Sequence, residues 1–396
     1  MNRFSLFRLV ISVKHFEEKR ASMGALNFLS PIHPKILSVL IVLFRYKFVS
    51  FLFVFFRVLQ TSSQKYSSNG LPAPVFFDNS FHSARKFSDL KNIFCDEFSQ
   101  SHLLPAFPKI KVILSSLYLA IKYREISGSN VNALLVSMQI TAAITYFYLF
   151  KDVQSIISRS THIIVANDHS PAPLALTAIA KIGNVKTMCL QHAPISSIFP
   201  RPIMSYFIVD NYESYALYKK KNPLTKFYIH TLNYSEIRKK HLDVDVVAFA
   251  LNELIDKKTI EFVTSVLSQQ FSLVELKFHP STSLSECKKL VDILPGNCKV
   301  VESTDKLTAK NVLCPLSGVA VELCYMGHLV TLLDIGNGFD MDYYGFLSLN
   351  LADSMRIDEL DQFRLKDREN LNYSYDKFSP RYELRDIKSI YDLDKA

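Results

Sequence analysis

Polar side chains follow several apolar segments of this sequence, and the clearest case is Val274-Glu-Leu-Lys-Phe-His279-Pro280. The apolar stretch predicts a buried strand that delivers His279 to one end of a sheet, where Pro280 fixes the turn. An imidazole in that position suits hydrogen bonding or proton donation to a departing phosphate. A surface histidine at an ordinary turn is the alternative interpretation.

A second polar element is Ser317-Gly318, which precedes a helix predicted at Val319–Met326. The start of a helix presents backbone N–H groups and the positive end of its dipole, and both attract anions. Glu322 lies about one and a half turns into this helix, where its carboxylate would accept hydrogen bonds from ribose hydroxyls. The alternatives are a simple N-cap for Ser317 and a solvated helix face for Glu322.

Two further polar pairs, Asn167-Asp168 and Gln191-His192, each follow an apolar segment that predicts a strand. Asp168 or His192 would remove a proton from an acceptor hydroxyl, and Asn167 and Gln191 would lie beside them on the acceptor side. For Asp168 the alternative is a helix N-cap.

Short apolar segments alternate with helix-compatible segments through the middle of the chain. The predicted strands are Ala133–Val136, His162–Ala166, Val185–Leu190, Val244–Phe249, Leu273–Phe278, Lys299–Glu302, Val312–Leu313 and Leu329–Leu333. The predicted helices are Thr141–Ser158, Pro173–Ile182, Lys257–Gln270, Ser283–Leu294 and Val319–Met326. Buried strands joined by helices predict an α/β fold with parallel sheets and functional residues at the carboxyl ends of the strands. We expect two Rossmann-like domains facing across a cleft, at 75–235 and 243–352, and a helical tail at 353–396.

An N-terminal arm, residues 1–61, precedes these domains and is both apolar and basic. Its first 60 residues hold nine Lys and Arg against two Glu, whereas the remaining residues hold 37 basic and 35 acidic side chains. Its apolar runs Ile36–Phe44 and Phe48–Phe56 are each too short to span a bilayer. We expect an in-plane anchor on an anionic membrane surface, with a buried helical hairpin as the alternative. The first 22 residues add little beyond charge, so Met23 is an alternative start, and 62–80 predicts a loop.

Several classes of function lack support in this sequence. No basic stripe with interleaved aromatic residues occurs outside the arm, so we expect no nucleic-acid partner. The six cysteines form no Cys-x-x-Cys pair, which favours reduced thiols over disulfides or zinc. Nucleotide-binding and hydrolase glycine motifs are absent, and two short Asp-x-Asp matches, at Asp243 and Asp340, are weak signals for a metal. We expect neither a metal nor a cofactor.

The order of these motifs resembles that of GT-B glycosyltransferases of bacterial surface polysaccharides. The residues that carry the resemblance are Asn167-Asp168, Gln191-His192, His279-Pro280 and Ser317-Gly318 with Glu322, across roughly 130–335. The likeness includes the sialyl- and polysialyltransferases and the related CDP-glycerol glycerophosphotransferases. The chain departs from both groups, because Ala193 stands where the glycerophosphotransferases carry glycine and because the acidic base motif of the sialyltransferases is missing.

The resemblance implies an inverting, metal-independent glycosyltransferase of capsule or lipopolysaccharide synthesis. Its donor would be a nucleotide-activated sugar, CMP-linked sialic acid among the options, and its acceptor a glycan or lipid-linked glycan. His279 would contact the donor phosphate and act as the acid, with Pro280, Ser317 and Gly318 at the phosphate and Glu322 at the ribose. The enzyme would be cytoplasmic and peripheral on the inner face of the cell membrane. A CDP-alditol phosphotransferase, a nucleotide-sugar epimerase and a non-catalytic scaffold of a polysaccharide assembly complex are the alternatives.

Overall fold

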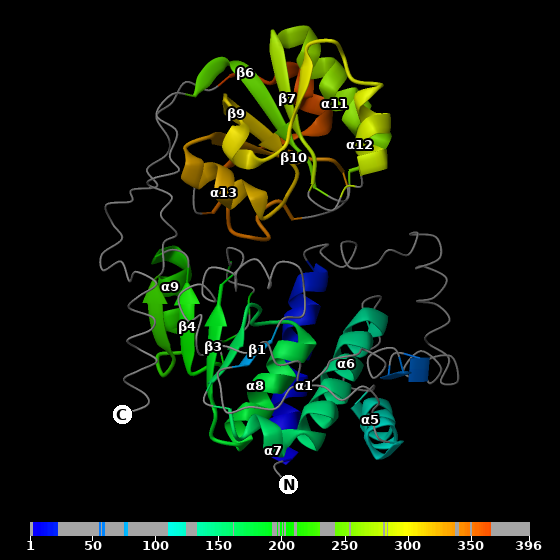
Figure 1. Cartoon of the computed structure of the whole chain (residues 1–396), viewed down its shortest axis with the longest axis vertical. Coiled ribbons are helices and arrows are strands. Elements are labelled where there is room, and N and C mark those ends of the chain that lie inside the picture. The colour runs from blue at the N-terminus through cyan, green and yellow to red at the C-terminus, as the bar shows by residue number, and fades with distance from the viewer. Residues whose placement is uncertain are drawn as a thin grey trace. The chain divides into compact units, whose positions relative to one another are not determined.

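The computed structural model shows two compact units, each built on a parallel sheet (Figure 1). One comprises the described residues of Met1–His192 and Ser197–Thr231, and the other comprises those of Ala193–Ser196 and Leu232–Ser379. The residues that the structure describes are 3–22, 55–56, 58–59, 75–77, 110–123, 133–160, 162–191, 196, 199, 201, 203–209, 212–229, 242–252, 255–279, 282, 284–336, 340–348 and 351–365.

The sheet of unit 1 has five parallel strands whose spatial order follows the sequence. They are β1 (Val75–Phe77), β2 (His162–Val165), β3 (Lys186–Leu190), β4 (Tyr206–Val209) and β5 (Lys226–Ile229). Crossovers between parallel strands are right-handed, so connections that always step the same way across a sheet place their helices on one face. The described helices that join consecutive strands of unit 1 therefore share a side of the sheet.

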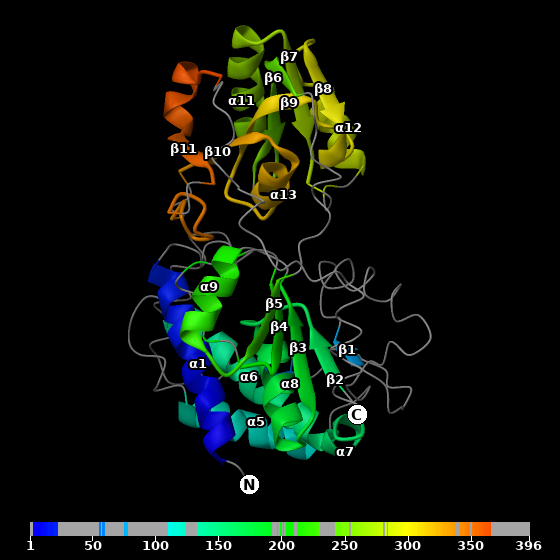
Figure 2. The same ribbon diagram turned by 90° about the vertical axis from the view of Figure 1, so that its left-hand side faces the viewer.

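These helices pack around α6 (Ala133–Asp152), which contacts α1 (Arg3–Ser22), α5 (Ile110–Tyr123) and α8 (Pro171–Ile182). Figure 2 shows α1 and α6 beside α8 in the turned view. The short α7 (Gln154–Ile157) follows α6, and α9 (Tyr212–Lys221) joins β4 to β5. Proline at the start of α8 and Gly183 at its end match the usual preferences for helix termini.

Helix α1 is an integral part of unit 1. Its side chains Leu6, Leu9, Val10, Val13 and Phe16 are all buried, and the helix contacts both α6 and α8. The expectation that the first 22 residues add little beyond charge is therefore wrong. None of the described helices is long and apolar enough to cross a membrane. The run Ile36–Phe44 and most of Phe48–Phe56 lie outside the described residues.

The sheet of unit 2 has six parallel strands in the order β11-β10-β9-β6-β7-β8. They are β6 (Asp243–Ala250), β7 (Leu273–Lys277), β8 (Cys298–Val301), β9 (Ala309–Cys314), β10 (Leu329–Asp334) and β11 (Asp353–Arg356). Strands β6, β7 and β8 lie side by side in sequence order. The chain then crosses to the other edge of β6, where β9, β10 and β11 follow in sequence order. The strand order therefore reverses between β6 and β9.

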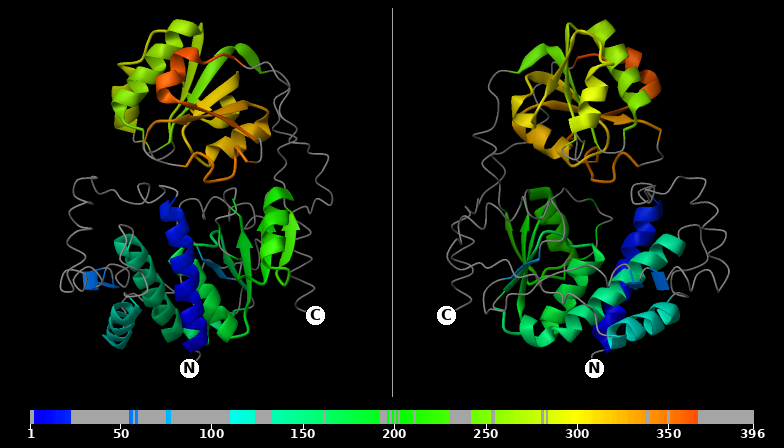
Figure 3. Two further views of the ribbon diagram at one scale, coloured as in Figure 1. Left: turned by 180° about the vertical axis from the view of Figure 1, so that it is seen from behind. Right: turned by 45° about the vertical axis from the view of Figure 1, so that its right-hand side comes forward.

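This reversal places the helices of unit 2 on both faces of the sheet. One face carries α11 (Lys257–Gln270), α12 (Leu284–Val291) and the 3-10 helix η4 (Ile357–Gln362), which bury Val247, Phe249 and Leu251 of β6 and its extension. The other face carries α13 (Val319–Met326) and the 3-10 helix η3 (Thr304–Lys306). Figure 3 shows α13, in orange, across the strands from α11, in yellow-green.

The two Rossmann-like domains predicted from the sequence are confirmed, and their arrangement across a cleft stays a prediction. Three local expectations are wrong. Ala133–Val136 begins α6 instead of forming a strand, the expected loop at 62–80 contains β1, and the segment after Ala352 opens with β11 and η4. Short apolar runs fit a buried helix as well as a strand, which explains the first of these errors. The rest of the tail, from 366, lies outside the described residues.

Candidate functional site

The candidate donor site lies in unit 2 at the carboxyl ends of the central strands. Ligands of open α/β sheets bind where the strand order reverses, because adjacent crossovers leave the sheet on opposite faces there. That point is the boundary between β6 and β9. The two strand ends are tied together by Asn252, whose side-chain amide donates to the carbonyl oxygen of Leu316 at 3.4 Å.

His279 lies two residues beyond β7, on the other side of β6 from β9. Its side chain is partly exposed, and its carbonyl oxygen accepts from the backbone N–H of Thr282 at 2.9 Å, which closes a turn. Two strand spacings separate the ends of β7 and β9 by about 10 Å, a gap that side chains and a phosphate group can bridge. Pro280 lies outside the described residues.

Ser317 and Gly318 form the start of α13, next to the end of β9. The Ser317 hydroxyl accepts weakly from the backbone N–H of Val319 at 3.4 Å, and Gly318 is the N-cap residue without a side-chain cap. A methyl group added at Gly318 would meet no atom within 4 Å. The start of the helix therefore has open space at Gly318, while the backbone N–H groups of Val319 and Ala320 donate to the hydroxyl and carbonyl oxygens of Ser317.

Glu322 is held by a hydrogen bond from within unit 2. Its Oε1 accepts from the hydroxyl of Thr304 in η3 at 2.8 Å, and its side chain is half-buried. The alternative of a solvated helix face is thus wrong, and the carboxylate has a fixed position on the α13 side of the sheet.

Strand β7 brings two further charged residues to the α13 side, Glu275 and Lys277, and both are buried. The Glu275 carboxylate accepts from the backbone N–H and hydroxyl of Thr308, both at 2.7 Å, and from the backbone N–H of Ala309 at 3.0 Å. Its role is therefore structural. Lys277 is the last residue of the strand and lies two residues before His279.

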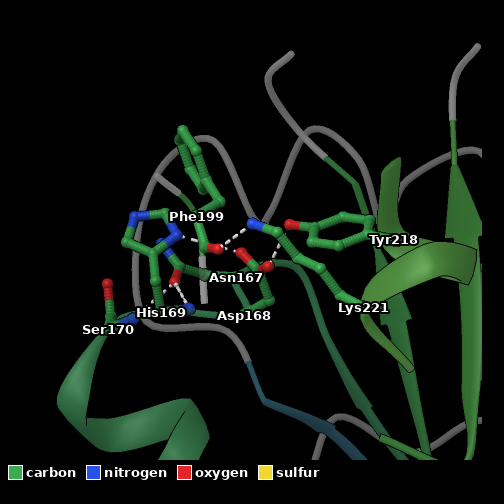
Figure 4. A network of polar contacts seen from close by, with 7 residues as sticks. All are labelled: Asn167, Asp168, His169, Ser170, Phe199, Tyr218 and Lys221. Carbon is green, nitrogen blue, oxygen red and sulfur yellow. Dashed lines mark hydrogen bonds and ion pairs between the residues drawn. The ribbon is translucent and has the colours of Figure 1, made fainter. Parts of the chain in front are cut away.

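The polar network of unit 1 lies in the loop between β2 and α8 (Figure 4). The Asn167 side-chain oxygen accepts from the backbone N–H groups of His169 at 3.0 Å and Ser170 at 2.7 Å. This turn leads into α8, whose N-cap residue is Ser170, so Asp168 does not have the N-cap role considered for it. Asp168 instead accepts from His169, with Nδ1 to Oδ1 at 2.9 Å, and from the hydroxyl of Tyr218 through Oδ2.

Burial and charge shift the pKa values of two α9 side chains in this network. Complete burial, then the negative charge of Asp168 and the hydrogen bond to it, raise the pKa of Tyr218 well above its usual value. Burial and then the neighbouring charge of Lys19 lower the pKa of Lys221 to about 8, although Asp168 opposes that shift. The Lys221 ammonium also donates to the carbonyl oxygen of Phe199. Tyr218 therefore stays protonated and remains a donor to Asp168 at neutral pH.

The remaining predicted acceptor-side residues lie at the end of β3. Gln191 is buried, and its amide donates to the hydroxyl of Ser214 in α9 at 2.8 Å. His192 lies outside the described residues. Sequence reasoning missed several polar residues that join the predicted ones: His169, Tyr218, Lys221, Asn252, Lys277 and Thr304. His169 alone had a local signal, because it directly follows Asn167-Asp168.

Metal ligands and disulfides are not found in the described part of the chain. No three His, Cys, Asp or Glu side chains gather there in a way that would hold an ion. Asp340 and Asp342 stabilise turns by accepting backbone N–H groups, and Asp243 does the same at the start of β6. The described cysteines carry free thiols: Cys189, Cys287, Cys298, Cys314 and Cys324.

Comparisons with known proteins give weak likenesses to solved structures. No protein-family model and no curated protein sequence matches the chain. S. aureus MnaA in its co-structure with UDP has a TM-score of 0.41 at 8% identity, over 73% of this chain and 86% of that one. Arabidopsis thaliana UGT89C1 complexed with quercetin has a TM-score of 0.39 at 10% identity, over 73% and 80%. The fold class, α/β with two parallel sheets, rests on the strand order of the sheets themselves.

Proposed function

We propose that this protein transfers a sugar from a nucleotide-activated donor to a glycan or lipid-linked acceptor. The observation that carries the proposal is the strand reversal of unit 2, which has His279 on one side of β6 and the open start of α13 on the other. A nucleotide phosphate placed there would receive hydrogen bonds from Ser317 and the helix N–H groups, and from the imidazole of His279.

The proposed reaction is a single displacement at the anomeric carbon. The acceptor hydroxyl gives its proton to a general base as its oxygen forms a bond to that carbon. The bond to the leaving phosphate oxygen breaks at the same time, and its electron pair stays with the phosphate. His279 donates a hydrogen bond or a proton to this oxygen, and the dipole of α13 stabilises the developing charge. Such a displacement inverts the configuration at the sugar, and these groups supply the charge balance without a metal.

The donor, acceptor and cellular location follow from the sequence resemblance and the N-terminal arm. We propose a CMP-linked sialic acid as the first donor to test, a surface glycan as the acceptor, and peripheral attachment to the inner face of the membrane. Glu322, which is fixed by Thr304, would accept hydrogen bonds from the ribose hydroxyls.

Nucleotide binding to purified variants tests the donor site. Isothermal calorimetry with CMP, CDP and UDP should show binding to the wild type, and His279→Ala and Ser317→Ala should weaken it about tenfold or more, because each removes a hydrogen bond to a charged group. His15→Ala and Ser354→Ala, both at exposed positions, are the matched controls. Unchanged affinity in both site variants would exclude this donor site.

Product analysis then separates the competing reactions. Release of CMP from CMP-N-acetylneuraminate supports glycosyl transfer, whereas turnover of CDP-glycerol alone identifies a phosphotransferase. A change in the sugar without any acceptor identifies an epimerase, and no nucleotide binding at all indicates a scaffold.

A further inference from the structure

The turn that joins α9 to β5 in unit 1 presents a large apolar side chain to solvent. Leu224 in this turn is 86% exposed, the highest value for a large hydrophobic residue in the described part of the chain. The side chains around it in the sequence are basic, and Lys219, Lys220 and Lys226 are all exposed. A leucine in water forgoes the favourable free energy of burial. The turn is therefore a candidate contact surface.

Hydrogen bonds hold this turn in one conformation. The side-chain oxygen of Asn222 accepts from the backbone N–H of Leu224 at 3.3 Å and from Nη2 of Arg201 at 3.1 Å. Its amide nitrogen donates to the hydroxyl of Thr225 at 2.8 Å, and that hydroxyl donates to the carbonyl oxygen of Met204 at 3.0 Å. Asn222 and Thr225 are buried. A partner can therefore bind Leu224 without first having to order the turn.

Further basic side chains lie at the same end of the sheet of unit 1. Lys186 begins β3 and Lys226 begins β5, and their ammonium groups lie 5.9 Å and 5.4 Å from the ring centroid of Tyr206, the first residue of β4. The ammonium group of Lys219 lies 5.8 Å from the ring centroid of Phe227 in β5. Because these strands are parallel, their first residues share one end of the sheet with the α9–β5 turn.

This end of the sheet has a large excess of positive charge. The segments that supply it, 181–209 and 214–229, contain no acidic residue. Burial and then the positive charges of Arg201 and Arg8 lower the pKa of Lys181, in the last turn of α8. Cations this close repel one another, and an anionic partner would reduce that repulsion. We define the basic surface of unit 1 as Lys181, Lys186, Arg201, Lys219, Lys220, Leu224 and Lys226.

We infer that the basic surface of unit 1 binds an anionic lipid bilayer, with Leu224 inserted among the lipids and the cations at the headgroup phosphates. Positive charge alone would suit any polyanion. An exposed leucine among the cations favours a partner that is anionic at its surface and apolar beneath, as a bilayer is. The inference rests on the membrane attachment in the proposed function, and it assigns that attachment to the folded body of unit 1 as well as to the N-terminal arm. It requires neither sugar transfer nor a donor site.

Vesicle binding by the full-length protein tests this surface. Vesicles of phosphatidylcholine with about one third phosphatidylglycerol should bind the wild type, and pure phosphatidylcholine should bind it far less. Lys219→Gln combined with Lys220→Gln should lower the partition coefficient about tenfold or more, because each cation near an anionic surface contributes about fivefold. Leu224→Ala should lower it about tenfold through lost apolar burial. Added salt should weaken binding of the wild type.

Matched control variants lie on α11 of unit 2. Lys257→Gln combined with Lys258→Gln removes two adjacent exposed lysines, and Phe262→Ala shortens an apolar side chain that is 49% exposed. Both controls should bind the vesicles as the wild type does. The binding of CMP, CDP and UDP should be unchanged in every variant, since none of them alters the candidate donor site.

Insertion of the turn can be measured directly because the sequence contains no tryptophan. Leu224→Trp supplies a single fluorophore, whose emission should shift to shorter wavelength on vesicle binding and be quenched by lipids brominated on their acyl chains. Phe262→Trp, on α11, should show neither effect.

Several outcomes would overturn the inference. They are partition within about twofold of the wild type in both surface variants, or emission of Leu224→Trp that neither shifts nor is quenched. Displacement from vesicles by inorganic phosphate at constant ionic strength would assign the cations to a free phosphate. Equal binding of a single-stranded DNA oligonucleotide by the wild type and Leu224→Ala, without vesicle binding, would assign them to a nucleic acid. A wild type that binds vesicles as expected but binds no nucleotide would contradict sugar transfer and leave this inference standing.

Discussion

Replacement of Tyr218 by phenylalanine isolates the hydrogen bond that holds Asp168. The Tyr218 side chain is fully buried, and its ring packs 4.6 Å from that of Phe207 and 6.3 Å from that of Phe227, centroid to centroid. Phenylalanine preserves these ring contacts and removes only the hydroxyl. Oδ2 of Asp168, a residue that is 6% exposed, then loses the hydrogen bond from the Tyr218 hydroxyl.

The loss of stability caused by Tyr218→Phe follows from the charge and burial of the Asp168 carboxylate. A hydrogen bond to a charged group contributes about 1.5–3 kcal/mol, and a buried acceptor left without its donor costs a similar amount. Lys221 remains near Asp168 and offsets part of this loss. We therefore expect the free energy of unfolding of unit 1 to fall by about 2 kcal/mol, which raises the unfolding equilibrium constant about 30-fold.

Native-state hydrogen exchange read by mass spectrometry is the suitable assay, because it reports on each unit separately. Peptides from β2, β3 and α8 should lose protection about 30-fold in Tyr218→Phe, whereas peptides from β6 and β9 should keep theirs. Tyr118→Phe removes a hydroxyl from an exposed ring on α5 and serves as the control. Equal protection in wild type and Tyr218→Phe would refute the assigned contact.

Three other perturbations give defined outcomes. The pKa of Lys221 is about 8 in the folded protein against 10.5, so folded unit 1 binds fewer protons than the unfolded chain between these values. Urea midpoints of unit 1 should therefore rise from pH 8 to pH 10, and Lys221→Met should flatten this rise. Above pH 10 the raised pKa of Tyr218 should lower the midpoints again. Glu275→Gln keeps one oxygen for the two backbone N–H donors, removes the negative charge and turns an amide N–H toward the Thr308 hydroxyl. Unit 2 should therefore lose about 2 kcal/mol in urea unfolding followed by circular dichroism, and no measurable loss would contradict the three hydrogen bonds. Phe16→Ala removes a buried ring of α1 and should lower the free energy of unfolding of unit 1 by about 3–5 kcal/mol by the same measurement. Phe7→Ala, at a half-exposed position of the same helix, should lower it far less. Equal losses of stability in the two variants would argue against the packing of α1.

Local sequence patterns were sufficient to predict much of the secondary structure of unit 2. The helices at Lys257–Gln270 and Val319–Met326 were predicted with the bounds that the structure shows, because apolar spacing marks α11 and a terminal glycine ends α13. At that glycine, Gly327, φ is 97°, a left-handed conformation that favours glycine and stops the helix. Strand ends are local features too, so the placement of His279 and Ser317 beyond β7 and β9 was predictable.

Unit 1 was harder to predict because its determinants are distant in sequence. Strand β1 has only three residues and follows a Pro-Ala-Pro segment, so nothing local separates it from a loop. The hydrogen bond from Tyr218 to Asp168 joins residues 50 apart, and the contact of Phe16 with His169 is more remote still. The spacing of apolar residues and the local composition carry no information on such pairs. The packing of α1 and α9 brings them together.

The two strand orders also imply different routes of divergence. In unit 2 the candidate residues follow adjacent strands, so hydrogen-bonded backbone fixes their spacing whatever the neighbouring side chains are. In unit 1 the strand order never reverses, and the environment of His169 is assembled from α1, the β2–α8 loop, Phe199 and α9. Relatives of this chain should therefore show coupled substitutions at Phe16, Asp168, Phe199 and Tyr218, while residues around β6 and β9 vary independently of one another.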